Sequence, residues 1–181
     1  PHLYLQNDAT LGQIASIDRA YEQVDTPYIY HCEDDWLFPT SLFIAESRAV
    51  LEAQADVHAV MLRAWSEAPD AQNLAAPGEI AGVKVRIANP KAHRRWGSFS
   101  FNPGLRRTSD YRDHAPYARI GPERDLSHYH KLRGFRLVYL EAGDVTHFGF
   151  EPTVKTDEIR RKKARGFLLK SLRHRIEYAW F

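Results

Sequence analysis

Cysteine is almost absent from the 181 residues, and no long hydrophobic run occurs. The single cysteine, Cys32, excludes an intrachain disulfide framework and a cysteine-rich zinc site. No apolar stretch approaches the ~20 residues that a membrane-spanning helix needs, and no basic segment followed by an apolar one predicts a secretory signal. Hydrophobic residues make up 44% of the chain and charged residues 27%, which is enough for a packed core. We therefore expect a globular domain in the cytoplasm.

Acidic residues are scarce at the end of the chain. Residues 155–181 hold nine Lys and Arg against three Asp and Glu, a net charge of +6, whereas residues 1–154 sum to −4. Apolar residues recur there at helical spacing, namely Ile159, Leu168, Leu172, Ile176 and Trp180. The sequence thus predicts a domain over 1–154 followed by a basic amphipathic helix. That helix is either an ordinary solvated helix or a peripheral contact with an acidic membrane or partner, and we expect no nucleic-acid partner.

Periodicity along the chain predicts alternating strands and helices. We expect four helices, over 11–23, from near Thr40, over 123–133 and from 156 onward. Thr10 and Gln13 form a capping box at the start of the first, and Gly134 follows the end of the third. We expect strands over 2–6, 28–32, 57–64, 83–87, 97–101, 135–140 and 145–149, with a mobile loop over 66–82. Because strands alternate with helices, the fold class is α/β.

Three consecutive acidic residues, Glu33, Asp34 and Asp35, follow the predicted strand 28–32. Side chains alternate along a strand, so Glu33 and Asp35 are expected on one face and Asp34 on the other. Ligands of open α/β sheets bind outside the carboxyl ends of the strands. Two carboxylates there suit Mg²⁺ or Mn²⁺, which would also contact a substrate diphosphate. The alternative is a solvated acidic turn.

Two further segments carry candidate chemistry. Glu123 and Asp125 open the predicted helix 123–133, where carboxylates either stabilise the helix dipole or serve as a general base. His147 lies in a short apolar strand, where a histidine is either a core residue or a ligand. No histidine pair has the spacing of a zinc hydrolase, so that class is poorly supported.

Three segments, in their order along the chain, resemble a known family. They are the acidic triplet, the Glu-x-Asp-Leu-Ser helix start at 123–127 and the Val-Thr-His-Phe-Gly segment at 145–149. From about residue 7 to 150, the chain is similar to the C-terminal two-thirds of a family 2 glycosyltransferase with the GT-A fold. The resemblance implies a Rossmann-like mixed sheet flanked by helices. It also implies metal-assisted, inverting transfer of a sugar from a UDP- or GDP-linked donor to a saccharide or lipid-linked acceptor.

The resemblance also implies roles for individual residues. Asp35, with Asp34, falls at the donor-binding DxD position, and Asp35 would hold the Mn²⁺ or Mg²⁺ on the donor diphosphate. Glu33 stands where the family usually has Asp. Glu123 falls at the position of the catalytic base, and Asp125 could share or replace that role. His147 matches a histidine that completes the metal shell in some GT-A enzymes.

The family's acceptor region corresponds to Trp96 and the stretch 97–104, and we expect Trp96 and Trp36 to stack on acceptor sugars, although Trp96 could equally be a core residue. The family's first βαβ unit, which holds the nucleotide base, would precede residue 1. We therefore expect an N-terminally incomplete domain, unless the nucleotide pocket is built differently or donor binding has been lost.

Two other functions fit the same residues. Clustered carboxylates would also serve a metal-dependent phosphoryl or nucleotidyl transferase, with two metals held by Glu33, Asp35 and a third acid. A non-catalytic module could instead dock on an acidic membrane or partner through 155–181, with binding that falls as salt is added.

Overall fold

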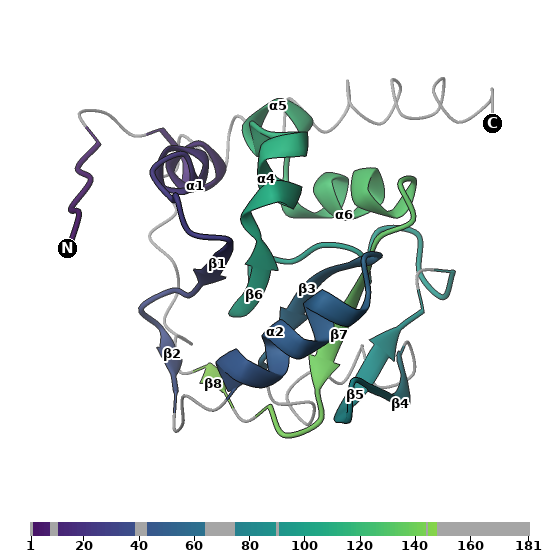
Figure 1. The fold of residues 1–181 in the computed structure, drawn as a ribbon. Coiled ribbons are helices and arrows are strands. Elements are labelled where there is room, and N and C mark those ends of the chain that lie inside the picture. Colours follow the sequence, from purple (N-terminus) through teal and green to yellow (C-terminus); the bar gives the residue numbers. More distant parts are fainter. Residues whose placement is uncertain are drawn as a thin grey trace, which may run out of the picture. The chain divides into compact units, whose positions relative to one another are not determined.

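The computed structural model describes residues 2–7, 11–38, 43–63, 75–89, 91–143 and 145–147. These residues belong to the first of two compact units, 1–148, and the second unit is 149–181. The predicted basic helix over 155–181 lies outside the described residues. The described part is a mixed α/β domain with a six-stranded sheet (Figure 1).

The helices are α1 (Gln13–Tyr21), α2 (Phe43–Ala53), α4 (Thr108–His114), α5 (Tyr117–Ile120) and α6 (Glu123–Lys131). The strands are β1 (Tyr28–His31), β2 (Trp36–Leu37), β3 (Val57–Met61), β4 (Ala75–Ile80), β5 (Val83–Ala88), β6 (Gly104–Arg107), β7 (Arg136–Leu140) and β8 (Thr146–His147). The six-stranded sheet has the order β1-β6-β3-β7-β5-β4, and β2 pairs with β8 in a separate two-stranded sheet.

Strand direction brings three carboxyl ends to one edge of the sheet. β6 is antiparallel to both β1 and β3, and β3 is parallel to β7. Strands β1, β3 and β7 therefore run in the same direction. The acidic triplet after β1 and the segment leading to β8 after β7 both begin at this edge, where α/β sheets bind ligands.

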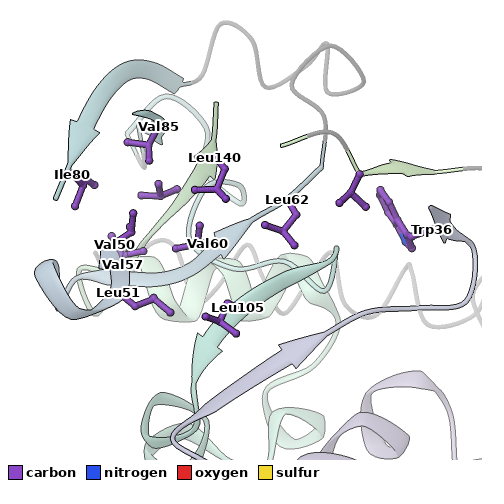
Figure 2. Close-up of a cluster of buried hydrophobic side chains, with 12 residues drawn as sticks. Trp36, Val50, Leu51, Val57, Val60, Leu62, Ile80, Val85, Leu105 and Leu140 are labelled. Carbon is purple, nitrogen blue, oxygen red and sulfur yellow. The ribbon is translucent and has the colours of Figure 1, made fainter. Parts of the chain in front are cut away.

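Alternation along the buried strands produces a core on each face. Val60 and Leu62 pack with Val50 and Leu51 of α2, in the cluster that also contains Trp36 (Figure 2). Ala59 and Met61 face the other way and pack with Leu137 and Tyr139 of β7. Both faces of β3 are buried, because it lies inside the sheet between antiparallel β6 and parallel β7 with a core on each side.

A third cluster, rich in aromatic rings, joins β1 to the helices α1, α4, α5 and α6. Its buried members are Tyr21, Ile29, Phe99, Phe101, Tyr111, Tyr117 and Leu126. Asp18 of α1 ties this layer together, because its carboxylate accepts hydrogen bonds of 2.8 Å each from the backbone N–H groups of Tyr117 and Ala118 at the start of α5. Such a capping bond satisfies N–H groups that a helix leaves without an internal partner.

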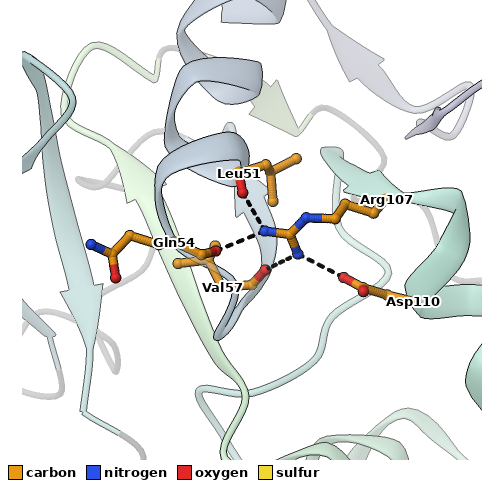
Figure 3. Close-up of polar contacts among 5 residues, drawn as sticks. All are labelled: Leu51, Gln54, Val57, Arg107 and Asp110. Atoms are coloured by element: carbon orange, nitrogen blue, oxygen red, sulfur yellow. Dashed lines mark hydrogen bonds and ion pairs between the residues drawn. The ribbon is translucent and has the colours of Figure 1, made fainter.

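Arg107, at the end of β6, closes the C-terminal end of α2 (Figure 3). Its guanidinium donates to the carbonyl oxygens of Val57 at 2.9 Å, of Gln54 at 2.7 Å, and of Leu51. It also forms an ion pair of 2.8 Å with Asp110. The last carbonyls of a helix lack intrahelical donors, so one side chain here satisfies several backbone acceptors at once.

Most of the predicted elements are confirmed, with ends shifted by a few residues, but the segment around 97–107 is not as expected. Residues 97–101 are not a strand; the strand is β6, which lies between β1 and β3. Asn102-Pro103-Gly104 has the composition of a turn, yet Gly104 is already part of β6. A Cβ there would lie 2.6 Å from the carbonyl oxygen of Val60, so glycine permits the close pairing of β6 with β3.

Three other expectations are corrected. Residues 75–80 of the predicted loop 66–82 form β4, joined to β5 by a two-residue turn at Ala81 and Gly82, whose φ angles of 52° and 78° suit a hairpin. Residues 2–6 are not a strand. Helix α1 is capped by Gly12 without a side-chain bond, and Gln13 contacts Glu33 instead of completing a capping box.

Candidate functional site

The acidic triplet lies in the connection between β1 and β2. Strand β1 ends at His31, and Asp34 and Asp35 occupy a turn, so the expected strand alternation does not position them. Glu33 and Asp35 are nonetheless half-buried, and Asp34 is exposed. The turn therefore directs two of the three carboxylates toward the protein. Gln13 of α1 donates a 3.0 Å hydrogen bond to Glu33 and holds the first of them.

Asp35 is in direct contact with His147. The Nε2 atom of His147 lies 3.0 Å from Oδ2 of Asp35, and the two side chains are 26% and 39% exposed. The short sheet explains this contact, because Trp36 pairs with His147 in the β2–β8 register and their rings lie 4.8 Å apart. The other carboxylate oxygen of Asp35, Oδ1, is buried and has no hydrogen-bond partner among the described residues.

Glu123 is positioned by a segment that precedes β6. It is the first residue of α6, and its Oε1 accepts a 2.9 Å hydrogen bond from the hydroxyl of Ser100. Ser100 is itself fixed, because its Oγ accepts from the backbone N–H of Asn102 at 3.1 Å and its carbonyl accepts from Arg106 at 2.8 Å. Arg106 is fully buried, so this support for Glu123 extends into the core.

The electrostatics of Glu33 connect the triplet to Glu123. Burial is the largest influence and raises the pKa of Glu33, the hydrogen bond from Gln13 opposes that change, and the negative charges of Asp35 and Glu123 raise the pKa further. Glu33, Asp35 and Glu123 therefore share one electrostatic environment, although the triplet and α6 are far apart in the sequence. Grouped carboxylates repel one another, and a bound cation would relieve that repulsion.

Asp125, the second candidate base, has a different environment from Glu123. It lies in the first turn of α6 with its side chain 21% exposed, and Oδ1 is 3.8 Å from Nε of its neighbour Arg124. Its backbone N–H donates to the carbonyl of Pro122 at 2.7 Å. These contacts match a carboxylate that stabilises a helix start.

The two tryptophans expected to bind an acceptor are largely occupied by protein contacts. Trp36 is 7% exposed and belongs to the core cluster around Val60, so its faces have little area left for a sugar in this conformation. Trp96 is half-buried and stacks on Tyr139, with ring centroids 6.1 Å apart and an angle of 14°. Its stacked face is therefore covered, as in the core alternative.

The predicted ligands Glu33, Asp35 and His147 do not form a three-residue metal cluster. Over the described ranges, no group of three or more His, Cys, Asp or Glu side chains is arranged to hold a metal ion. A Mg²⁺ or Mn²⁺ ion bound together with a diphosphate needs only one or two protein carboxylates, with water and phosphate oxygens as its other ligands. The unpartnered Oδ1 of Asp35 is a hard oxygen donor of the kind that such a site uses. The residues present thus fit a divalent cation that is held jointly by a protein carboxylate and the substrate diphosphate.

Sequence reasoning missed three residues of this region, Arg63, Ser100 and Tyr139. Arg63 follows β3 at the same edge of the sheet, and Tyr139 lies near the carboxyl end of β7. Arg63 falls inside the predicted strand 57–64, so a search for polar residues just after each predicted strand would have passed over it. No local signal marks Ser100, because its role depends on α6 lying beside it.

Comparison with known proteins gives no family for this chain. It matches no protein-family model, no curated protein and no solved structure at a significant level. Among the described residues, no helix has the length and apolar character that crossing a membrane requires.

Proposed function

We propose that this chain is part of an inverting glycosyltransferase with the GT-A fold, which moves a sugar from a nucleoside-diphosphate donor to an acceptor hydroxyl. The observation that carries the proposal is that the charges of Asp35 and Glu123 both act on Glu33, which follows β1 at the carboxyl ends of three strands of the sheet. A mixed sheet with acidic residues outside its carboxyl ends supports the same assignment. We place the reaction in the cytoplasm, with peripheral membrane contact through 155–181.

In this proposal the two acidic motifs have separate tasks. Asp35 would hold a divalent cation together with the donor diphosphate, with His147 orienting the Asp35 carboxylate through its 3.0 Å contact. A cation at this position supplies charge neutralisation for the leaving nucleoside diphosphate. Asp34 is exposed beside Asp35 and is available to contact the donor from the solvent side.

Glu123 would act as the general base. It is exposed at the first position of α6, where it can reach an acceptor hydroxyl, and the Ser100 hydrogen bond fixes one of its oxygens. The other oxygen remains to accept the proton as the hydroxyl attacks the anomeric carbon. Attack from the face opposite the leaving diphosphate inverts the configuration at that carbon. Asp125 would stabilise the start of α6, with Glu123 as the proton acceptor.

Calorimetric titration with UDP and GDP, each with and without Mn²⁺, tests the donor site. Wild type and Asp35→Asn are compared with Asp25→Asn, which removes an exposed carboxylate in the loop before β1. We expect binding that requires Mn²⁺ in wild type and in Asp25→Asn, and loss of that binding in Asp35→Asn. Absence of nucleotide binding in wild type, or equal binding by Asp35→Asn, would contradict the proposal.

Catalysis is tested separately, with Glu123→Gln as the variant and release of the sugar from the donor as the signal. This substitution keeps the size of the side chain and removes its basicity. We expect a fall in kcat of about 100- to 10,000-fold with unchanged donor affinity, the range for loss of a general base. The same assay with Asp125→Asn shows whether the second carboxylate shares the role; a larger loss there than in Glu123→Gln would reverse the assignment.

A further inference from the structure

Arg63 is a cation at the edge of the sheet that holds the candidate carboxylates. It lies two residues beyond the end of β3 and forms an isolated parallel bridge with Val145. The backbone N–H of Val145 also donates to the carbonyl of Leu62 at 3.3 Å. The segment that ends in His147 is therefore tied directly to the segment that carries Arg63.

The surroundings of Arg63 connect it with both acidic motifs. Its guanidinium carbon lies 5.7 Å from the centroid of the Trp36 ring, and Trp36 is adjacent in sequence to Asp35. Tyr139 of β7 pairs with Met61 of β3, two residues before Arg63. Burial raises the pKa of Tyr139, the positive charge of Arg63 opposes that change, and the negative charge of Glu123 adds to it. Arg63 and Glu123 thus both lie within electrostatic reach of one phenol.

The guanidinium of Arg63 has hydrogen-bond donors without an acceptor among the described residues. Within the described part of the chain, it forms no ion pair and no hydrogen bond, and its one ring contact there is with Trp36. Its Nε is buried without a partner, and the side chain as a whole is half-buried. A buried donor without an acceptor is costly, so a bound ligand that supplies one would be favoured.

We propose that Arg63 binds the diphosphate group of the substrate. A guanidinium offers a planar fork of N–H donors that matches phosphate oxygens in a bidentate manner, which an ammonium does not. The Trp36 ring holds the guanidinium plane by a cation–π contact and leaves its edge for the anion. Assignment of this diphosphate to a sugar donor rests on the function proposed above, whereas phosphate binding by Arg63 does not.

The test is calorimetric titration of the full chain, in the presence of Mn²⁺, with UDP, GDP and inorganic pyrophosphate. Arg63→Gln removes the charge, and Arg63→Lys keeps the charge but loses the fork. Arg48→Gln is the matched control, because Arg48 is an exposed residue of α2 whose contacts with described residues are with Glu52 and Tyr28. Circular dichroism and thermal melts establish that each variant is folded.

We expect Arg63→Gln to weaken pyrophosphate and nucleoside-diphosphate binding by about 10- to 100-fold, with Arg63→Lys intermediate and Arg48→Gln unchanged. Equal affinity in wild type, Arg63→Gln and Arg63→Lys would overturn the inference while leaving the proposed function in place. Arg63-dependent binding of pyrophosphate without binding of UDP or GDP would support the inference and argue against a UDP- or GDP-linked donor. No binding of any of the three by wild type would overturn both.

Discussion

Asp35 and His147, which are 112 positions apart in the sequence, lie 3.0 Å from each other in the folded chain. The contact depends on the two-residue strands β2 and β8, whose pairing places Trp36 opposite His147. A histidine that touches a carboxylate ligand fixes the orientation of that carboxylate. The pair therefore connects the acidic turn after β1 with the segment after β7.

We expect His147→Ala to weaken Mn²⁺ binding in the presence of UDP by about 10- to 100-fold, the range for loss of a group that orients a metal ligand. Asp35→Asn should have a larger effect, because it removes the ligand charge itself. Electron paramagnetic resonance of free Mn²⁺ measures the affinity. His2→Ala, at an exposed histidine, is the control. An unchanged affinity in His147→Ala would show that the contact has only a structural role.

Ser100→Ala should lower kcat by about tenfold, through loss of the hydrogen bond that orients Glu123, with little change in KM for the donor. Because Ser100 is 6% exposed, the protein could also lose stability, so Ser100→Thr is measured in parallel. The threonine keeps the hydroxyl and should restore most of the rate. If both variants have the wild-type kcat, Ser100 does not position the base.

Buried histidines should make the protein less stable in acid. Burial lowers the pKa of His31 and of His130 to about 3, from the ordinary 6.5. The next largest influence is the positive charge of Arg106 on His31 and that of His114 on His130. Both are neutral in the folded state and become protonated in the unfolded state below pH 6.5. Their contribution to stability is therefore complete above pH 6.5 and is lost as the pH falls toward 3.

At pH 5 the loss amounts to about 2 kcal/mol for one such histidine. Urea unfolding at pH 7.5 and pH 5.0 measures the change. His130→Phe is the informative variant, because His130 already stacks on Phe99 with centroids 5.2 Å apart and an angle of 11°. Between pH 7.5 and pH 5.0, the free energy of unfolding of His130→Phe should fall by about 2 kcal/mol less than that of wild type. The same slope in both proteins would rule out His130 as its source.

Arg107→Gln should destabilise the fold by about 3 kcal/mol, because the carbonyls of Leu51, Gln54 and Val57 lose a charged donor and Asp110 loses its ion-pair partner. Chemical denaturation gives the free energy of unfolding. Arg48→Gln, which breaks an exposed i, i+4 ion pair, should change it by no more than about 0.5 kcal/mol. Equal effects in the two variants would show that the α2 cap contributes little.

Local patterns were sufficient for elements whose residues carry a clear periodicity or boundary. Helix α6 begins at Glu123, and Gly134 after it has the positive φ of 84° that such a glycine permits, as expected from the sequence. Strand β6 was missed because Gly-Leu-Arg-Arg has neither strand propensity nor alternation in its favour. Its position between two buried strands makes it a strand, and no neighbouring residue in the sequence supplies that information.

Three features could be predicted from the chain alone: the α/β class, the acidic triplet beside a buried strand and the carboxylates that open α6. These are properties of residue type and short-range spacing, so no distant contact is needed to read them. Contacts between distant residues were needed to show that Asp34 and Asp35 lie in a turn, that His147 contacts Asp35, that Ser100 holds Glu123 and that Arg63 contacts Trp36 beside Asp35. Each of these depends on strand pairing and burial between residues far apart in the chain, because hydrogen-bond partners and desolvation are set by whatever the completed fold brings together.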